Sequence, residues 1–373
     1  MSKNSNLTSA KRAKNDEFYT QFADIQKEMN AYLEFDPDVF RDKTILLPCD
    51  DPEWSNFTLF FAQNFESFGI KKLISTSYVK SAQLKANEFN PSDLESSSDH
   101  YDPVKSANQG KIFTLTKDVT RDGKIDIDDL EWAYLEGDGD FRSEELLALR
   151  AEADLIITNP PFSLFREFVA WLSEANKKFI VVGSMNAITY KEIFPLIKEN
   201  KLWLGVNPVK EFLQPNGSVK KFGNILWYTN LDHGRRHQPI DLMTTADNLR
   251  YSKRLTKRLK GKDSYEMYTN YNAIEVPYVD AIPSDHEGVM GVPITFLSKY
   301  CPDQFEILGM CENEDLYSLK TRIYAKEDCK HAYFAKFGRK GTYDLNASGV
   351  LLQDGLLEKV YQRILIKHRS QNQ

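Results

Sequence analysis

The residues best suited to chemistry lie in a short turn, Asn159-Pro160-Pro161-Phe162. Two consecutive prolines donate no backbone hydrogen bond, so the carbonyls of Asn159 and Pro160 can act as acceptors in a stiff geometry beside the Asn159 side-chain oxygen. Such a cradle suits an NH2 group, and Phe162 adds a flat apolar face that could stack on a planar ring. An ordinary loop with Phe162 in the core explains the same residues, so the turn alone leaves both interpretations open.

A strand must present this turn to its ligand. Leu155, Ile156 and Ile157 form a short apolar run, β-branched in its second half, which is typical of a strand buried on both faces of a parallel sheet. The two prolines then end the strand. Because ligands of open α/β sheets bind at the carboxyl ends of the strands, the pattern predicts that Asn159 lies at a ligand-binding edge.

The part of the chain before this turn predicts a strand, a helix and a second strand. Residues 42–49 are expected to form the first strand, which the acidic turn Asp50-Asp51-Pro52 ends. Apolar residues recur at helical spacing over residues 56–68, and Gly69 is a natural C-cap. Residues 72–79 form the second predicted strand, and this order implies a right-handed crossover in a parallel sheet.

The chain continues this α/β pattern to about residue 230. Residues 86–111 are rich in Ser, Asp, Asn and Pro and lack periodicity, so we expect an exposed loop there. Periodic apolar positions predict helices at 22–33, 143–152, 165–172 and 190–198, and strands at 178–184, 202–206 and 223–229. The last two strands are expected to form an antiparallel pair joined by a long loop.

No metal site is expected. Residues 118–129 are similar to a calcium-binding loop with Gly123 at its sixth position, but Thr120 takes the third ligand position and Asp129 replaces the bidentate glutamate at the twelfth. The four cysteines form no CxxC pair and no zinc spacing. Cys49 follows a proline, as some nucleophilic cysteines do, yet the acidic residues after it would raise the pKa of its thiol, so we expect a structural role.

Composition bounds the class of protein. The chain has 373 residues, which suggests two domains, or one α/β domain with a large insertion or appendage. Hydrophobic residues make up 41% of it, enough for a sizeable core. It shows no apolar signal region and no apolar run near the ~20 residues of a membrane helix, so we expect a soluble, cytoplasmic protein without a membrane partner. The net charge of −6 does not by itself indicate a nucleic-acid binder.

Positive charge nevertheless gathers beyond residue 230. The candidate DNA contacts in this basic segment are Arg235, Arg236, Lys253, Arg254, Lys257 and Arg258, and the aromatics interleaved with them are Tyr251, Tyr265, Tyr268 and Tyr271. A phosphate-tracking surface requires such a concentration of charge, although a solvated basic face explains it equally well. We assign His233 and His237 to phosphate contact rather than to catalysis. Farther on, short strands are expected at 293–297 and 305–309, before a basic carboxyl end at 363–369.

A long set of motifs is more specific than any one of them. It comprises DEFYTQ at 16–21, CDDP at 49–52 with SNF at 55–57, GDGDFRS at 137–143, TNPPFSLFRE at 158–167, MNAI at 185–188, FGNI at 222–225, TNLD at 229–232 and GVMGVP at 288–293. With these segments the chain resembles the EcoRI-type adenine-specific DNA methyltransferase family over most of its length.

This resemblance implies S-adenosylmethionine as the cofactor and assigns residues to it. The matching positions are Phe18, Tyr19 and Thr20 at the methionine end, Asp50 and Asp51 near the amino acid or ribose, Asp140 on the adenine amino group, Phe141 stacked on the adenine ring, and Asn159. No Gly-x-Gly follows the first strand, a departure from most methyltransferases that the family shares. The backbone therefore cannot approach the cofactor in the usual way.

The resemblance also implies direct methyl transfer to adenine N6, with Asn159, Pro160, Pro161 and Phe162 as the catalytic turn. The Asn159 side chain and the Pro160 carbonyl would accept the hydrogens of N6 and make the nitrogen more nucleophilic. The adenine must first leave the duplex, and stacking on Phe162 and a second aromatic offsets that cost. Candidates for the second aromatic are Phe222, which we favour, Trp227 and Tyr228.

We therefore expect an α/β protein with a Rossmann-like S-adenosylmethionine-dependent methyltransferase sheet in residues 1–232 and a C-terminal α+β DNA-recognition region in residues 233–373. Its partner would be double-stranded DNA, in restriction–modification or in orphan methylation. We expect a monomer that forms no stable complex with a restriction endonuclease. Methylation of RNA adenine or of protein glutamine, and an inactive DNA-binding relative, are the alternatives.

Overall fold

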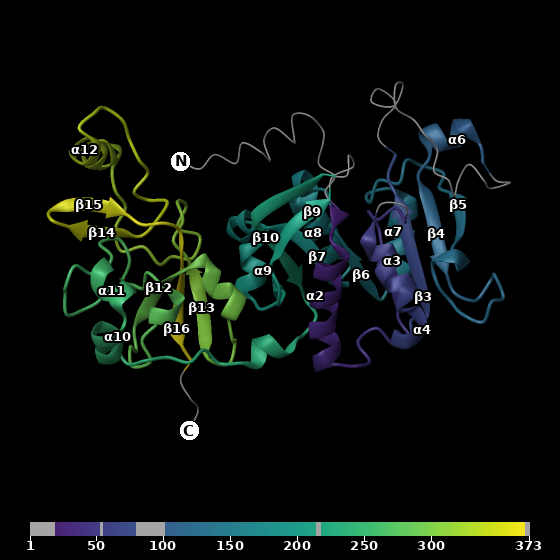
Figure 1. Cartoon of the computed structure of the whole chain (residues 1–373). Helices are drawn as coiled ribbons and strands as arrows, with labels where there is room; N and C mark the ends of the chain where they lie inside the picture. The colour runs from purple at the N-terminus through teal and green to yellow at the C-terminus, as the bar shows by residue number, and fades with distance from the viewer. Residues whose placement is uncertain (1–18, 53–54, 80–100, 214–217, 370–373) are drawn as a thin grey trace. The chain divides into compact units, whose positions relative to one another are not determined.

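The computed structural model describes residues 19–52, 55–79, 101–213 and 218–369. The chain divides into two compact units, Met1–Gly234 and Arg235–Gln373, and their helices and strands are labelled in Figure 1. No helix in the described ranges is both long enough and apolar enough to cross a membrane. The catalytic and recognition roles expected for residues 1–232 and 233–373 stay predictions.

The first unit is built on a ten-stranded sheet in the order β1-β9-β10-β7-β6-β2-β3-β4-β5, with β8 paired to β10. At its centre run four parallel strands, β2 (Thr44–Leu47), β3 (Lys72–Ser77), β6 (Leu155–Thr158) and β7 (Lys178–Ser184). Every residue of β2 and β6 is buried, as expected for strands covered on both faces. The predicted parallel core is therefore confirmed, with a first strand shorter than residues 42–49.

Antiparallel strands extend this sheet at both edges. β4 (Lys111–Leu115) and β5 (Glu131–Tyr134) follow β3 at one edge. At the other edge, β10 (Val219–Thr229) pairs with β7, with β8 (Trp203–Leu204) and with β9 (Val209–Leu213), and β1 (Tyr19–Thr20) pairs with β9. The sheet is thus mixed, and the predicted antiparallel pair near residues 202–206 and 223–229 is confirmed.

Two predicted loops contain regular structure. Within the expected loop 86–111, α6 (Pro103–Asn108) forms where Asp102 accepts hydrogen bonds from the first backbone amides of the helix. Residues 86–100 lie outside the described part of the chain. The long loop expected after residue 206 is also wrong, because β9 and the first residues of β10 pair with each other there.

Helices cover both faces of the sheet. α2 (Phe22–Phe35) and α3 (Asn56–Gln63) share one core with Ile45, Leu47 and Ile157. α7 (Glu144–Glu152) and α8 (Phe165–Glu174) contact β2 and β7, respectively. The chain steps from β2 to β3 in one direction along the sheet and from β6 to β7 in the other, so right-handed crossovers place α3 and α8 on opposite faces.

Local signals explain where these helices begin and end. The helix predicted at 56–68 is interrupted at Asn64, which separates α3 from α4 (Phe65–Phe68), and Gly69 ends α4 with φ 65°, as predicted. Helices at 22–33, 143–152 and 165–172 are confirmed, whereas the one expected at 190–198 shortens to α9 (Phe194–Lys198). Among its described residues this unit has the 3-10 helices η2 (Ile127–Asp129), η3 (Phe162–Leu164), η4 (Met185–Thr189) and η5 (Gly234–His237), the last of which continues into the second unit.

The second unit contains a four-stranded sheet in the order β11-β12-β16-β13 and a separate hairpin. The sheet strands are β11 (Ala273–Glu275), β12 (Val289–Pro293), β13 (Phe305–Met310) and β16 (Arg363–His368); the hairpin is β14 (Val350–Gln353) and β15 (Leu356–Lys359). The helices are α10 (Thr245–Tyr251), α11 (Lys253–Arg258), α12 (Lys326–Phe337), η6 (Val279–Ala281) and η7 (Ile294–Lys299). The strand predicted at 305–309 is confirmed, but the one at 293–297 is wrong, because the chain turns into η7 after Pro293.

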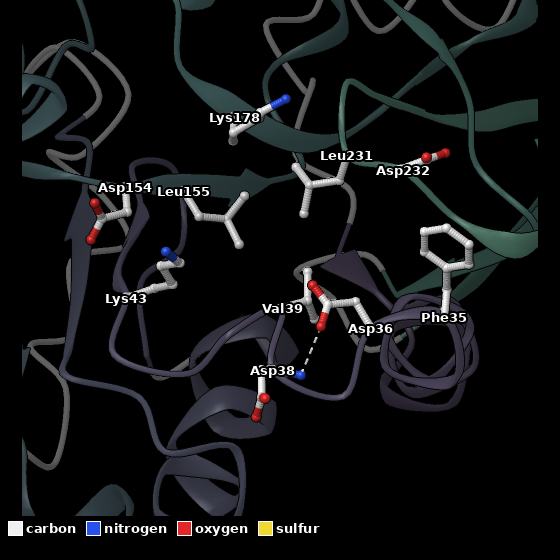
Figure 2. Close-up of a pocket in the computed structure, with 10 residues that line it drawn as sticks. All are labelled: Phe35, Asp36, Asp38, Val39, Lys43, Asp154, Leu155, Lys178, Leu231 and Asp232. Carbon is white, nitrogen blue, oxygen red and sulfur yellow. Dashed lines mark hydrogen bonds between the residues drawn. The ribbon is translucent and has the colours of Figure 1, made fainter.

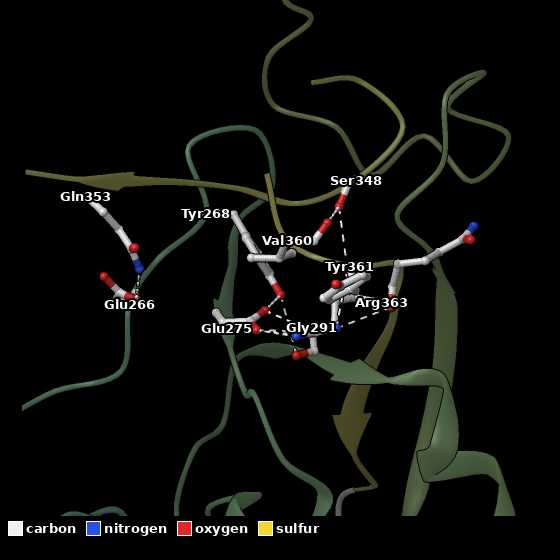
Figure 3. A network of polar contacts seen from close by, with 10 residues as sticks. Glu266, Tyr268, Glu275, Gly291, Ser348, Gln353, Val360, Tyr361 and Arg363 are labelled. Carbon is white, nitrogen blue, oxygen red and sulfur yellow. Dashed lines mark hydrogen bonds and ion pairs between the residues drawn. The ribbon is translucent and has the colours of Figure 1, made fainter. Parts of the chain in front are cut away.

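A buried ion pair lies inside this second sheet (Figure 3). Arg363 on β16 donates to Glu275 on β11 with an Nη2–Oε1 distance of 2.6 Å, and the Tyr268 hydroxyl donates to the same carboxylate. All three side chains are buried, at 8%, 2% and 5% exposure. Part of the predicted basic carboxyl end is therefore committed to the core, since removing either charge would leave the other buried without compensation.

Candidate active site

The Asn159 turn stands at the carboxyl edge of the parallel strands, as the sequence predicted. β6 ends at Thr158 between β2 and β7, and η3 begins at Phe162. Asn159 and Phe162 are half-buried, while Pro160 is buried. The turn is closed by a hydrogen bond from the Leu164 amide to the Pro161 carbonyl, at 2.9 Å. A half-buried amide and a half-buried ring at a strand end are accessible to a ligand in part, which suits recognition of a planar amine.

One buried aromatic ring joins the two predicted stacking residues. Phe212 on β9 packs edge-on against Phe162, with ring centroids 6.1 Å apart, and against Phe222, at 5.6 Å. Phe222 therefore lies near the Asn159 turn, although its role as the second aromatic stays a prediction. The alternatives Trp227 and Tyr228 are wrong, because both rings are fully buried in the core.

The first residues of the described chain come to the same place. Thr20 on β1 pairs with Phe212 on β9, and its carbonyl accepts a hydrogen bond of 2.8 Å from the Asn56 side chain at the start of α3. The predicted methionine-end segment is thereby placed beside the ring that contacts Phe162. Tyr19 is half-buried and Thr20 is buried, and Phe18 lies outside the described residues.

The Asp50 carboxylate points into the protein. Its Oδ1 accepts from the Ser55 hydroxyl and its Oδ2 from the Thr158 hydroxyl, both at 2.6 Å. Burial leaves 3% of the residue exposed and raises the pKa of Asp50 to about 7, against the opposing effect of the two hydroxyl donors. Asp51 is half-buried at the following position. The sequence revealed the acidic turn but not the direction of its first carboxylate.

The Asp140 loop is held against the end of β3. Gly139 has φ +85°, and a Cβ there would lie 2.1 Å from the Ser77 carbonyl oxygen, so only glycine fits this close approach. The Val79 amide also donates to the Asp138 carbonyl at 2.8 Å. These contacts bring Asp140 to the carboxyl edge that carries Asn159, where the sequence predicts it together with the acidic turn after the first strand.

Asp140 is paired with a neighbouring guanidinium. Arg142 donates to both carboxylate oxygens, through Nε at 2.8 Å and Nη2 at 2.6 Å, and also reaches Glu167 on α8 at 2.9 Å. The hydrogen bonds from Arg142 hold the pKa of the Asp140 carboxyl below its usual range. The carboxylate stays ionised and keeps lone pairs for a further donor, so an amino group could be its second partner. Sequence reasoning missed this role of Arg142.

Phe141 is more deeply buried than a stacking platform requires. It is 4% exposed and packs edge-on against Phe168 and Trp171 of α8, with centroids 5.0 and 5.7 Å away. Its predicted stacking on a cofactor ring stays a prediction, and the described arrangement presents little of its face. Its observed contacts anchor the Asp140 loop to α8.

The thiol and the acidic loop behave as structural elements. Burial, and then the negative charge of Asp50, raise the pKa of the Cys49 thiol, which is the direction expected for a structural cysteine. The Asp129 carboxylate accepts hydrogen bonds from the amides of Val119, Thr120 and Asp126, so the calcium-like loop closes on itself. No group of three or more His, Cys, Asp or Glu side chains that could hold a metal ion occurs among the described residues.

The basic segment is divided between surface and core. Lys253 and Lys257 are exposed one helical turn apart on α11. The Arg254 guanidinium stacks over the Tyr278 ring, with its Cζ 3.5 Å from the ring centroid. Arg235 and Arg258 are half-buried, whereas Arg236 is only 7% exposed. Lys253, Arg254 and Lys257 are therefore the exposed members of the predicted DNA contacts.

Several aromatic and histidine assignments in this segment are corrected. Tyr265, Tyr268 and Tyr271 are buried, so only Tyr251 is exposed as an interleaved aromatic. His233 is 1% exposed, with its Nε2 3.0 Å from the Leu204 carbonyl, and is therefore not available as a phosphate contact.

A pocket of about 510 Å³ opens on the opposite edge of the first sheet (Figure 2). It lies at the amino ends of β2, β6 and β7, where Lys43, Asp154 and Lys178 line it together with Phe35, Asp36, Asp38, Val39, Leu155, Leu231 and Asp232. Because the Asn159 turn follows the carboxyl end of β6, this pocket is separate from the candidate active site.

Comparisons with known proteins agree with this arrangement. Residues 6–369 match the family described as "Adenine-specific methyltransferase EcoRI". The chain is 40% identical over 328 residues to the Type II methyltransferase M.EcoRI of Escherichia coli, and this alignment covers 83% of the chain and 90% of that protein. It is 35% identical over 339 residues to the Type II methyltransferase M.MpnI of Mycoplasma pneumoniae, and this alignment covers 85% of the chain and 90% of that protein. No solved structure gave a match. The chain belongs to the EcoRI family of adenine-specific methyltransferases.

Proposed function

We propose that this chain methylates N6 of adenine in double-stranded DNA, with S-adenosylmethionine as the methyl donor, as the modification enzyme of a restriction–modification system. The observation that carries this proposal is the Asn159-Pro160-Pro161-Phe162 turn at the carboxyl edge of a parallel sheet. Phe222 lies near it on the shared Phe212 ring. The match to adenine-specific methyltransferases supports adenine as the amine.

The residues at this edge fit an adenosine-bearing cofactor. The ionised Asp140 carboxylate is a suitable acceptor for an adenine amino group, and Tyr19 and Thr20 lie beside the Phe212 ring that contacts the catalytic turn. Phe18, Asp51, Phe141 and Asn159 complete the proposed contacts. When bound, S-adenosylmethionine supplies the activated methyl group.

The protein's part in the transfer is to hold and polarise the target amine. The Asn159 side-chain oxygen and the Pro160 carbonyl accept the two N6 hydrogens, which draws the nitrogen lone pair out of conjugation with the ring. Phe162 and Phe222 stack on the extruded base and offset the few kcal/mol that unstacking costs. Positioning supplies most of the acceleration, and the surplus proton passes to solvent.

DNA binding is assigned to the second part of the chain. Residues 1–232 would form a Rossmann-like catalytic region, and residues 233–373 would form an α+β recognition region. The compact unit that begins at Arg235 supports this division. Lys253 and Lys257 are exposed on one face of α11 and suit phosphate contact, with Arg235, Arg254 and Arg258 as further contacts.

Transfer of a labelled methyl group from S-adenosylmethionine to duplex DNA, followed by nucleoside analysis, tests the proposal. We expect N6-methyladenine from the wild-type protein and none from Asn159→Ala. Asn108→Ala, which removes an asparagine from α6, is the matched control and should retain activity. Labelling of RNA or of protein glutamine without labelling of any duplex would contradict the assignment to DNA.

A further inference from the structure

A buried polar cluster lies beneath the catalytic turn, and it joins four elements. The Asp50 carboxylate, just beyond β2, accepts from Ser55 at the start of α3 and from Thr158 at the end of β6. Its backbone carbonyl accepts from Thr58 on α3, at 3.1 Å, and from Ser75 on β3. One residue is therefore tied to both neighbouring strands and to the helix that follows it.

The Thr158 contact stands where the backbone ladder stops. β2 and β6 are paired at Ile45 with Leu155 and at Leu46 with Ile156, and this pairing does not continue to Thr158. On the other side, β6 stays paired with β7 up to Thr158. The 2.6 Å bond from the Thr158 hydroxyl to Asp50 thus links the end of β6 to the β2 side, where Thr158 also contacts Cys49. Asn159 is the next residue.

We propose that Asp50 is a positioning residue, which fixes the Asn159 turn through Thr158, rather than a direct ligand of the cofactor. Both carboxylate oxygens already accept hydrogen bonds from buried hydroxyls, and 3% exposure leaves them out of reach of a ligand. This inference rests on the proposed role of Asn159. It deepens that role by naming what holds the residue in place.

Burying an ionised carboxylate costs free energy, so the presence of Asp50 in the core needs a reason. A hydroxyl that donates to an ionised carboxylate forms a shorter and stronger bond than one that donates to a neutral acceptor. Geometry errors of about 1 Å at a reacting group can cost about 100-fold in rate. A charge-assisted bond one residue before Asn159 therefore fixes the position of the turn where small displacements would lower the rate.

The test uses Thr158→Val, which keeps the shape and removes the hydroxyl, and Thr158→Ser, which restores the hydroxyl. Single-turnover methyl transfer is measured at pH 8 with saturating cofactor and DNA, and the cofactor Kd is measured separately by equilibrium binding. Thr229→Val is the matched control, because Thr229 is equally buried and its hydroxyl also bonds within the sheet, near the amino end of β7.

We expect Thr158→Val to lower the transfer rate constant by about 10- to 100-fold with less than about threefold change in cofactor Kd. Thr158→Ser should recover most of the rate, and Thr229→Val should leave the rate unchanged even where it lowers the melting temperature. Asp50→Asn combined with Thr158→Val should be no slower than the slower single variant, since both act through one bond.

Three outcomes would overturn the inference. A folded Thr158→Val protein with the wild-type rate would show that the bond does not position the turn. A parallel rise in cofactor Kd would make Asp50 and Thr158 part of the cofactor site. An equal rate loss in Thr229→Val would reduce the effect to general destabilisation. Full activity of Asn159→Ala would instead contradict the proposed function, so the two failures are distinguishable.

Discussion

Ionisation of Asp50 should cost the first unit stability, and Asp50→Asn should remove that cost. Burial raises the pKa of Asp50 in the folded protein to about 7, whereas an unfolded aspartate titrates at about 3.9. Between these two values the folded state binds more protons than the unfolded state, so the free energy of unfolding falls as the pH rises. Above about pH 7 both states are ionised, and the cost is constant.

The size of the effect follows from the pKa difference. Each pH unit between the two pKa values is worth about 1.4 kcal/mol, so from pH 5 to pH 8 the wild-type protein should lose on the order of 2 to 3 kcal/mol relative to Asp50→Asn. The neutral asparagine resembles the protonated aspartate, and its own contribution does not change with pH.

Denaturant unfolding followed by tryptophan fluorescence measures this difference. All five tryptophans lie in the first unit, so their emission reports its unfolding selectively. Asp154→Asn, which removes an exposed carboxylate immediately before β6, is the control. A stability difference between wild type and Asp50→Asn that stays constant from pH 5 to pH 8, or that shrinks as the pH rises, would refute the reasoning. We expect the asparagine variant to be the more stable protein at pH 8 and the slower enzyme.

Three other variants test separate parts of the structure. Lys253→Gln with Lys257→Gln should reduce the slope of log Kobs against log salt for DNA binding by about 1.8, because each phosphate contact contributes about 0.9; fluorescence anisotropy at several salt concentrations measures it. Phe222→Ala should slow single-turnover methyl transfer by about 5- to 150-fold, because a stacking partner contributes about 1 to 3 kcal/mol. An unchanged rate would show that Phe222 is not part of the site. Arg363→Met should destabilise the second unit by about 3 to 5 kcal/mol, with much of the loss recovered when Glu275→Leu is added, as thermal unfolding would show.

The central strands and helices were predictable because their signals are local. A β-branched apolar run marks β6, helical spacing of phenylalanines marks α3, and Gly69 marks the end of α4 by its left-handed conformation. The paired edges of the sheet were not predictable in the same way. β1 has two residues, and its pairing with β9 is decided by contacts almost 200 positions apart in the chain, Tyr19 with Leu213.

In the candidate site, too, local signals were predictable from the sequence and contacts between distant residues were not. Residue types identified the Asn159 turn, but no sequence signal distinguished Asp50, which faces Ser55 and Thr158, from a carboxylate that faces a ligand. Phe212 had no signal at all, because its importance comes from the rings that it touches on two other elements.

The tyrosines of the basic segment show how a charge-based interpretation can mislead. Tyr265, Tyr268 and Tyr271 recur every three residues among cationic and polar neighbours, yet each ring is buried. Tyr268 in addition donates to the buried Glu275. Charge on the surrounding residues marked the segment as a surface, while these side chains pack inward.

Base-resolution sequencing of modified nucleotides in DNA from cells that express the protein tests the central claim most directly, because it reports activity, base and site together. The account predicts N6-methyladenine at one position of a defined sequence with the wild-type chain, and no such modification with Asn159→Ala at equal protein level. Unmodified adenine with the wild-type chain, or the same modification with Asn159→Ala, would contradict it.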